Sequence, residues 1–355
     1  MTSSTSFLRI PAASAVVLLA LAGCAAAPEE SPDAAASDYT ACMVANSGNL
    51  EDRSFNQASY EALQRAESEL GIELRTAVSQ SEGDYETNIN AMADAGCDYI
   101  LTVGWELAEA TAVGAETYPD INFSIVDETV EGDNIRSIVY DTAQAAFLAG
   151  YLAAGLSQTG VVGTFGGGNQ PPVTVFMDGY WDGVQHYNAE KGTNVRVVGW
   201  DKPSQTGSFT DDFVNAVLAR TLADGLIEQG ADIIMPVAAQ AGEGAATAAL
   251  EAGGVGIIWV DADGYETLAA QFQPLIVTTV LKQMSDAVFE IVSQDLEGEF
   301  EGGSYIGTLE NNGVALAPFH DWESKVPAEL AAELDALRDA IIAGEIVVES
   351  EASPR

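Results

Sequence analysis

Short apolar runs alternate with longer amphipathic segments from Asp38 almost to the end of the chain. Short unbroken apolar runs are typical of buried strands, and apolar residues repeating every three or four positions are typical of helices. Strands are expected at 40–46, 72–77, 98–103, 121–126, 135–139, 160–165, 195–199, 232–236, 255–260 and 274–278. Helices are expected at 55–70, 84–95, 106–117, 142–157, 174–190, 210–229, 242–252, 264–271 and 279–293. The alternation predicts an α/β fold of parallel sheets with helices on both faces.

The segment before this pattern reads as an export signal. Arg9 supplies its positive charge, and the apolar run 11–21 is too short to span a bilayer. The run ends Leu21-Ala22-Gly23-Cys24, and small residues before a cysteine resemble a bacterial lipobox. The resemblance implies cleavage after residue 23 and a diacylglycerol on Cys24, which would anchor the protein to the extracytoplasmic face of the cell membrane. An ordinary signal peptide with an incidental cysteine is the alternative, and residues 24–38 have the composition of a flexible tether.

Composition narrows the class of ligand. With 355 residues, the chain is too long for one compact unit and suits two lobes. Its formal net charge is −41, from 13 Lys+Arg against 54 Asp+Glu. Such a surface repels nucleic acid and disfavours phosphorylated ligands, so a neutral or cationic solute is favoured. Solubility alone would also account for most of these carboxylates.

Cysteine and histidine usage points away from metal and nucleophilic chemistry. Cys42 lies early in the first expected strand, and Cys97 comes just before the strand at 98–103. In a 2-1-3 strand order these strands are neighbours, so a disulfide is feasible outside the cytoplasm, and two separate buried thiols are the alternative. The histidines are His186 and His320, and no Cys-x-x-Cys occurs. No zinc site, cofactor or nucleophile–histidine pair is indicated.

The stretch 49–57 is the leading candidate for a binding site. It follows the first strand and precedes the first helix, and ligands of open α/β sheets bind at such junctions. It carries Asp52, Ser54, Phe55 and Asn56, which suit a small polar molecule with a flat part. Without a glycine run or a Lys-Ser/Thr pair it does not resemble a phosphate site. The alternative is that the Asp and Ser only cap the helix and that the Phe is core.

Further candidates lie later in the chain. The glycine-rich run 163–169 matches neither a dinucleotide-binding motif nor a P-loop, and indicates a permissive turn near a ligand. Asp261 ends an apolar strand and could accept hydrogen bonds from vicinal hydroxyls, or cap the next helix. Lys282, expected at the start of a helix, is either a solvated ion-pair partner or a donor in the cleft.

With these residues in place, the chain resembles the basic membrane protein family of substrate-binding lipoproteins, of the purine nucleoside receptor type. The resemblance rests on the order and number of many short motifs. They are Glu51-Asp52-Arg53-Ser54-Phe55-Asn56-Gln57, Val103-Gly104-Trp105, Ile125-Val126-Asp127, Phe147-Leu148-Ala149-Gly150, Gly166-Gly167 with Phe176 and Gly179, Gly207-Ser208-Phe209-Thr210, Gly230-Ala231-Asp232-Ile233-Ile234, Gly242 with Gly244, Val260-Asp261-Ala262-Asp263, Thr278-Thr279-Val280-Leu281-Lys282 and the run 307–314.

The resemblance implies a type I periplasmic-binding-protein fold, with two doubly wound lobes joined by a three-stranded hinge. The expected division is 1–23 signal peptide, 24–38 tether, 39–141 with 262–300 as the first lobe, and 142–261 with 301–355 as the second. The helix expected at 328–343 should pack on the second lobe, and residues 349–355 should fray.

The resemblance also implies roles for individual residues. A purine would stack between Phe55 and Phe176, and Asp261 and Lys282 would hold the ribose hydroxyls. Asn56 and Glu109 would read the base edge. The remaining expected ligand-binding residues are Asp52, Ser54, Trp105, Asp127 and Gly242. Glu109 stands where the family usually has Asp, and Trp105 where it usually has Phe, so these two positions put base preference in question.

The expected function is therefore the nucleoside-binding component of an ABC importer, with a preference for purines and without catalysis. Its partners would be a small-molecule nucleoside and a membrane permease, and it would act as a monomer anchored by lipid. One alternative is a protein of the same fold that binds another solute, such as a sugar. Others are a nucleoside hydrolase using Asp52, Asp127 or Asp261, and a surface regulator or adhesin without a small ligand.

Overall fold

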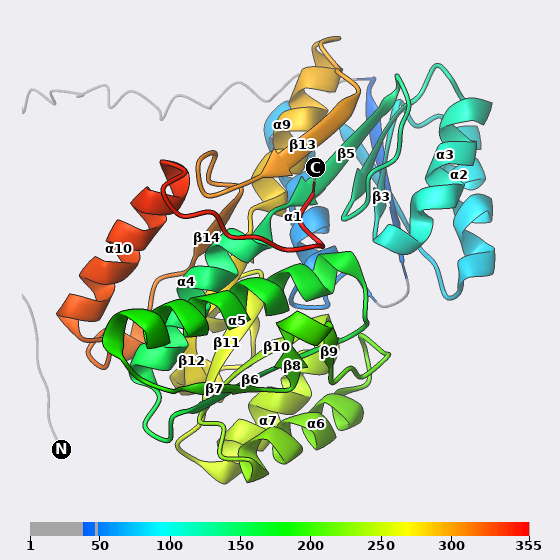
Figure 1. Ribbon diagram of the computed structural model, residues 1–355. Helices are drawn as coiled ribbons and strands as arrows, with labels where there is room; N and C mark the ends of the chain where they lie inside the picture. The colour runs from blue at the N-terminus through cyan, green and yellow to red at the C-terminus, as the bar shows by residue number, and fades with distance from the viewer. Residues whose placement is uncertain (1–37, 47–48, 355) are drawn as a thin grey trace, which may run out of the picture. The chain divides into compact units, whose positions relative to one another are not determined.

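Two sheets that are joined at several points along the chain form the framework of the protein (Figure 1). The computed structural model describes residues 38–46 and 49–354, and this part of the chain contains two six-stranded sheets and a small two-stranded one. The expected signal peptide, Cys24 and nearly all of the tether lie outside the described residues. The expected α/β fold with parallel sheets is confirmed.

The first sheet has the strand order β13-β5-β4-β3-β1-β2, and neighbouring strands run parallel. Its strands are β1 (Thr40–Ala45), β2 (Glu73–Val78), β3 (Tyr99–Val103), β4 (Asn122–Val126), β5 (Ile135–Tyr140) and β13 (Gly303–Gly307). Alternate side chains point to opposite faces. Met43 and Leu101 pack on the side of α1 (Phe55–Leu70) and α9 (Met284–Leu296). Cys42 and Ile100 pack on the side of α2 (Tyr85–Asp94) and α3 (Ala108–Thr117) (Figure 1). This sheet with these four helices is called the first lobe below.

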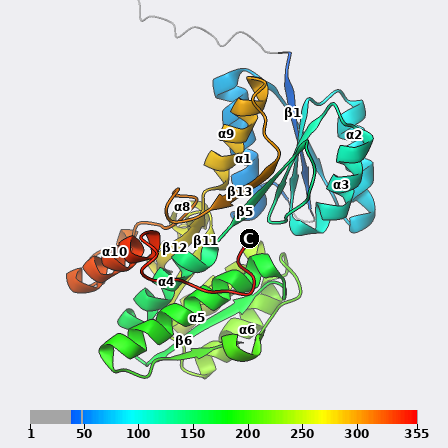
Figure 2. The ribbon, with the colours of Figure 1, turned by 45° about the horizontal axis from the view of Figure 1, so that its top comes forward.

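The second sheet has the order β14-β12-β11-β10-β6-β7, in which only β14 runs antiparallel to its neighbour. Its strands are β6 (Val161–Gly166), β7 (Arg196–Val198), β10 (Ile233–Val237), β11 (Gly256–Asp261), β12 (Ile276–Lys282) and β14 (Val314–Leu316). Its helices are α4 (Thr142–Leu156), α5 (Pro171–Lys191), α6 (Ala216–Glu228), α7 (Glu243–Ala252), α8 (Gly264–Thr267) and α10 (Ala328–Ile342). Figure 2 shows α4 and α5 on the face opposite α6. This sheet with these helices is called the second lobe.

Short elements fill the connections. The small sheet consists of β8 (Trp200–Asp201) and β9 (Thr206–Gly207), which the apolar pattern did not predict. The 3-10 turns are η1 (Glu82–Asp84), η2 (Trp105–Leu107), η3 (Lys202–Ser204), η4 (Ala239–Gly242), η5 (Gln273–Leu275) and η6 (His320–Trp322).

The uncharged segment 142–157 is a buried helix, as its composition predicted. Helix α4 packs against α5 closely enough that glycines are required in the contact. A Cβ atom on Gly150 would lie 2.0 Å from the carbonyl oxygen of Tyr180, and one on Gly183 would lie 1.9 Å from that of Phe147. Within residues 38–46 and 49–354, no helix has the length and apolar character needed to cross a membrane.

In the described chain the two sheets are linked by three connections. The chain passes from β5 to α4 at residues 140–142, from β12 to α9 at 282–284, and from β13 to β14 at 307–314. The connections are hydrogen-bonded to one another, since Asp141 N donates to Gly307 O at 2.9 Å and Gln283 N donates to Gly313 O at 2.9 Å. They form the hinge of the two lobes.

The expected lobe boundaries are wrong for two strands. Residues 262–300 were assigned to the first lobe, but β12 lies in the second sheet beside β11. Residues 301–355 were assigned to the second lobe, but β13 pairs with β5 in the first. The strand β12 also extends to Lys282, which is therefore the end of a strand and not the start of a helix. Its β-branched residues, including Thr278 and Thr279, favour the extended conformation beyond the predicted end at 278.

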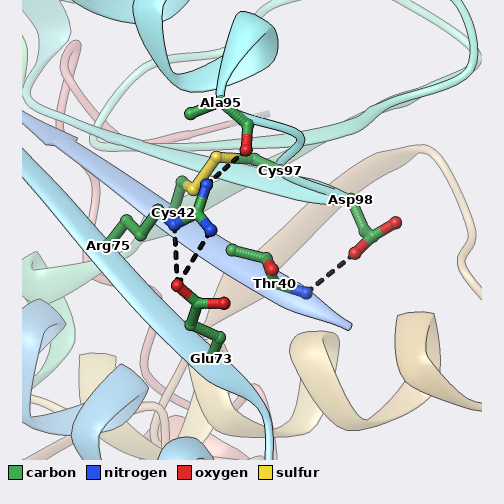
Figure 3. The surroundings of a disulfide bond; sticks show 7 residues. All are labelled: Thr40, Cys42, Glu73, Arg75, Ala95, Cys97 and Asp98. Carbon is green, nitrogen blue, oxygen red and sulfur yellow. Dashed lines mark hydrogen bonds and ion pairs between the residues drawn. A yellow bond between two sulfur atoms is a disulfide. The ribbon is translucent and has the colours of Figure 1, made fainter. Parts of the chain in front are cut away.

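A disulfide joins Cys42 of β1 to Cys97, the residue two before β3 (Figure 3). Their Cα atoms are 6.0 Å apart, because β1 and β3 are paired neighbours. Nearby, Arg75 forms an ion pair with Glu73 and donates a hydrogen bond to the carbonyl oxygen of Ala95. The structure therefore contains the disulfide and not two separate buried thiols.

The segment after α10 is packed and hydrogen-bonded through residue 354, whereas fraying was expected for 349–355, and Arg355 lies outside the described residues. Residues 346–354 run back over the second lobe, and Val348 is only 9% exposed. Side-chain hydrogen bonds hold Ser350 and Ser353. The polar sequence at the end of the chain predicted fraying. The hydrogen bonds to Asp178 and Asp141 were not predictable, because their carboxylates are distant in the sequence.

Candidate functional site

The main cavity of the described residues lies between the two lobes, at the carboxyl ends of their parallel strands. Its empty volume is about 710 Å³, including the space open to solvent at its mouth. Strand ends contribute residues from β1, β3, β4, β10, β11 and β12, and the N-terminal parts of α1 and α5 add aromatic rings. The lining residues are Asn46, Asp52, Phe55, Asn56, Gly104, Trp105, Glu106, Asp127, Pro172, Val173, Phe176, Phe213, Val214, Val237, Ala238, Ala239, Gln240, Val260, Asp261 and Lys282. Topology places ligands of α/β sheets at such an edge.

Most of the residues predicted from the sequence meet in this cavity. They are Asp52, Phe55, Asn56, Trp105, Asp127, Phe176, Asp261 and Lys282. Three predicted residues do not line it. Glu109 is exposed on α3, and Glu106, one turn earlier, is in the wall instead. Gly242 packs against the ring of Trp259, and Ser54 is buried behind the wall.

A lysine and two aspartates form the charged centre of the cavity. Lys282 Nζ lies 2.5 Å from Asp127 Oδ2 and 3.8 Å from Asp261 Oδ1, and the lysine side chain is 3% exposed. Both aspartates follow or end a strand with φ at 69°, a left-handed conformation that Asp adopts more readily than most residues. Burial raises the pKa of Asp127, and the ammonium of Lys282 opposes that shift.

Two phenylalanines from different lobes surround this centre. The Lys282 ammonium is 5.4 Å from the ring centroid of Phe55 and 5.2 Å from that of Phe176. Phe55 begins α1 of the first lobe, and Phe176 lies in the first turns of α5 in the second. Pro171 and Pro172 start α5 because proline suits the first positions of a helix, where no backbone donor is needed. A flat ligand could contact an aromatic ring from each lobe.

Amide and carboxyl groups at the ends of β1 and β3 form a hydrogen-bonding row. Asn56 Nδ2 donates to Asn46 Oδ1 at 3.1 Å, and Asn46 Nδ2 lies 3.3 Å from Glu106 Oε2. Asn56 Oδ1 is buried and has no partner among the described residues, so it can accept a hydrogen from a ligand. Desolvation raises the pKa of Glu106, while the bond from Asn46 opposes the rise.

Asp52 is a helix cap as well as a cavity residue. Its carboxylate accepts hydrogen bonds from the backbone N–H groups of Ser54, Asn56 and Gln57 at 3.0, 2.8 and 3.0 Å. Burial raises its pKa, and these three bonds oppose the rise. The capping interpretation of the sequence is therefore correct for Asp52, which orients the start of α1 and with it Phe55 and Asn56.

Side-chain contacts join the two lobes around the cavity. Behind the cavity wall, Ser54 Oγ donates to Asp261 Oδ2 at 2.6 Å. At the mouth, Arg53 Nη1 lies 3.1 Å from Glu243 Oε2. Asn49 Nδ2 donates to Gln240 Oε1 at 3.3 Å. Closure excludes water and strengthens polar contacts with whatever is enclosed.

Several cavity residues were missed by the sequence interpretation. Asn46 follows β1 directly, so its position at a strand end was a usable signal, and Glu106 lies in η2, three residues after the end of β3. Phe213 and Gln240 carry no such signal, because the first lies in a loop that was predicted as helix and the second in η4.

The cavity chemistry is that of binding. Within residues 38–46 and 49–354 no group of three or more His, Cys, Asp or Glu side chains could hold a metal ion. The residues that line the cavity combine aromatic faces, acceptors for base-edge or amide hydrogens, and a lysine–carboxylate pair suited to hydroxyl groups.

Comparison with solved structures supports the fold. The fold is similar to that of an ABC transporter solute-binding protein from Aeropyrum pernix, with a TM-score of 0.77 and 23% identity, covering 88% of this chain and 94% of that one. With a cavity between two hinged lobes, the chain has the architecture of a two-lobed solute-binding protein. It belongs to the family described as ABC transporter substrate-binding protein PnrA-like, whose profile matches residues 39–352.

Curated relatives agree with this membership. The chain is 28% identical over 370 residues to the "ABC transporter nucleoside-binding protein BmpA" of Lactococcus lactis, covering 97% of this chain and 99% of the relative. It is 30% identical over 310 residues to "Basic membrane protein A" of Borreliella burgdorferi, covering 85% and 86%. The resemblance noted from the sequence motifs is thus confirmed, and the chain is a transporter component and not an enzyme.

Proposed function

We propose that this protein binds nucleosides, with a preference for purines, and delivers them to a membrane permease. The observation that carries the proposal is the pair Phe55 and Phe176, contributed by opposite lobes to one cavity that also holds Lys282 between Asp127 and Asp261. Stacking of a base on an aromatic ring contributes roughly 1–3 kcal/mol. The printed name of the Lactococcus lactis relative supports the same ligand class.

The charge of the cavity supports a nucleoside over a nucleotide. Four carboxylates line it, from Asp52, Glu106, Asp127 and Asp261, against the single ammonium of Lys282. A phosphate group would face these carboxylates at low dielectric, where like charges repel strongly. Ribose hydroxyls can instead donate to Asp261 and accept from Lys282.

A thermal-shift screen of the lipid-free protein lacking residues 1–24 tests the proposal. Inosine, guanosine, adenosine, cytidine, their monophosphates, free bases and ribose are compared. A ligand at 100 times its dissociation constant should raise the free energy of unfolding by about 2.7 kcal/mol. Shifts with purine nucleosides but not with their monophosphates support the proposal. Shifts with sugars alone, or with none of the panel, contradict it.

Substitution of the second-lobe ring tests the stacking role. Phe176→Leu keeps an apolar side chain in place but removes the flat face, so inosine affinity should fall by about 5–100-fold. Phe123→Leu is the matched control, because Phe123 is fully buried in β4 and does not line the cavity. Equal affinity loss in both variants would mean that stability, and not stacking, is measured.

We propose further that Cys24 carries the lipid that holds the protein on the extracytoplasmic face of the membrane. The Leu21-Ala22-Gly23-Cys24 sequence supports this, as does the Cys42–Cys97 bridge, which suits an oxidising compartment. Cys24→Ala should move the protein from the membrane fraction to the medium or periplasm. Unchanged membrane association, together with a mature N-terminus other than residue 24, would contradict lipidation.

A further inference from the structure

Residues 346–354, called the strap below, extend from the second lobe to the hinge. In both views the red segment leaves α10, crosses α5 and approaches β5 (Figures 1 and 2). It has no regular secondary structure, yet Val348 is buried and Ile346 and Ala352 pack against the main apolar core. Its place is therefore set by packing and by side-chain hydrogen bonds.

One anchor ties the strap to α5 of the second lobe. Ser350 Oγ donates to Asp178 Oδ2 at 2.7 Å. Asp178 is fully buried, and its other oxygen accepts from Trp200 Nε1 and Gln205 Nε2 at 3.0 Å each. A buried carboxylate without donors is costly, so the seated strap completes the hydrogen bonding of Asp178. Lys202 Nζ adds a bond to the carbonyl oxygen of Glu349.

A second anchor reaches the hinge itself. Ser353 Oγ donates to Asp141 Oδ1 at 2.7 Å. Asp141 lies between β5 and α4, in the first of the three connections, and its N–H donates to Gly307 O in the third. Its other oxygen accepts from Gln144 Nε2 at 2.8 Å. The strap is thus bonded to the residue on which two hinge connections meet.

The end of the strap also forms part of a second cavity, which adjoins the ligand cavity. This cavity has an empty volume of about 450 Å³, including open solvent, and shares Asp127, Pro172 and Lys282 with the main one. Thr129 and Tyr140 of the first lobe and Val175 of the second lie in its wall, together with Ala352 and Pro354. The strap therefore forms part of the wall of the space beside the Asp127–Lys282 pair, together with residues from both lobes.

We propose that the strap fixes the hinge in its closed geometry, with Ser350 and Ser353 as positioning residues for ligand binding. Opening of the lobes would separate the two walls on which Ala352 and Pro354 rest and move Asp141, so the strap is seated best in the closed state. A ligand that also favours the closed state must then stabilise the strap, and the strap must strengthen ligand binding by the same factor. The ligand half of this inference rests on the proposed nucleoside function.

The test uses the full folded chain with Ser350→Ala and Ser353→Ala combined. Loss of the bond that seats the strap on α5 and of the bond that ties it to the hinge should weaken inosine binding about tenfold, mainly through faster dissociation. Ser157→Ala is the matched control, because Ser157 Oγ also donates to a carboxylate at 2.7 Å, that of Asp232, away from the hinge and both cavities. The control should bind within about twofold of the unaltered protein.

Amide hydrogen exchange supplies a readout that needs no ligand. In the ligand-free double variant, exchange should accelerate in residues 346–354 and in the hinge around Asp141, but not in β1 or β10. In the unaltered protein, inosine should slow exchange in the strap. Unchanged hinge exchange in the variant overturns the proposal, as does a strap whose exchange ignores bound ligand. If no nucleoside binds the unaltered protein, the proposed function fails, and the ligand-free exchange alone decides the role of the strap.

Discussion

Asp52, Asp127 and Asp261 are chemically identical, and their surroundings give them different tasks. Asp52 uses its oxygens to cap α1. Asp127 is paired closely with Lys282, and Asp261 accepts from Ser54 across the lobes. Only Asp261 combines a distant lysine with a single hydroxyl donor, which leaves acceptor capacity for a ligand. Among the three, it is the carboxylate best placed to hold ribose hydroxyls.

Asp261→Asn should lower nucleoside affinity about 10–100-fold with little change in fold. Asn tolerates the left-handed conformation at this position and can still accept from Ser54, but it loses the charge-assisted bond to a hydroxyl, worth roughly 1.5–3 kcal/mol. Isothermal titration calorimetry with inosine measures the change. Asp232→Asn, in the second lobe and outside the cavity, is the control. Affinity equal to that of the unaltered protein would show that the Asp261 carboxylate does not bind the ligand.

Glu106 makes stability depend on pH. Burial holds the pKa of its carboxyl above the ordinary value, so the folded state retains the proton more tightly than the unfolded chain. The resulting stabilisation is fully present below the ordinary pKa of Glu, about 4.3, and is lost as pH rises through the folded-state pKa. Glu106→Gln cannot ionise and should therefore be more stable than the unaltered protein at pH 7.5.

Urea unfolding at pH 7.5, 5.5 and 4.5 measures this difference. The advantage of Glu106→Gln should shrink as pH falls toward 4.3. A variant advantage that is constant or grows on acidification would show that Glu106 does not titrate as its burial implies.

At the scale of elements, the sequence predicts the buried strands and the edge strands β2 and β7, but it misses two other edge strands. Strand β3 is a continuous apolar run, buried throughout, and its prediction agrees with the structure. The edge strands β13 and β14 were missed, because partly exposed strands carry a mixed pattern that resembles a loop. Phe55 and Asp261 were found because they stand at the end of such buried strands or at the start of the following helix. Glu106 was not predicted, because it lies in the 3-10 turn η2 between β3 and α3. The packing of the strap was not predicted either, because its hydrogen-bond partners are distant in the sequence.

The disulfide stabilises the β1–β3 pair from the side of α2 and α3. It closes a loop with a sequence separation of 55 residues, and its removal should cost about 2–4 kcal/mol. The double variant Cys42→Ala, Cys97→Ala should therefore unfold at lower urea concentration. Because Cys42 points away from the cavity, inosine affinity should stay within about twofold. A variant as stable as the unaltered protein, compared without reductant, would contradict a formed bridge.

At the scale of the whole described chain, side-chain contacts join the two lobes around the cavity. Lys282–Asp127 joins the lobes inside the cavity and Ser54–Asp261 joins them behind its wall. Arg53–Glu243 and Asn49–Gln240 join them at the mouth. A ligand buried behind the mouth pairs cannot leave until they break. These outer pairs are therefore expected to control the dissociation rate more than the association rate.

Glu243→Gln tests the mouth contact without altering the cavity wall. The Arg53–Glu243 side chains are 39% and 24% exposed, so the pair is worth only about 0.2–1 kcal/mol, and inosine should dissociate about 1.5–5-fold faster. Asp286→Asn removes the same charge from an ion pair with Arg65 that lies within the first lobe, and its dissociation rate should match that of the unaltered protein. Stopped-flow displacement at 20 mM and 500 mM salt separates the two, because screening should erase the effect of Glu243→Gln at high salt. Equal rates for both variants at low salt would show that the mouth pair does not retain the ligand.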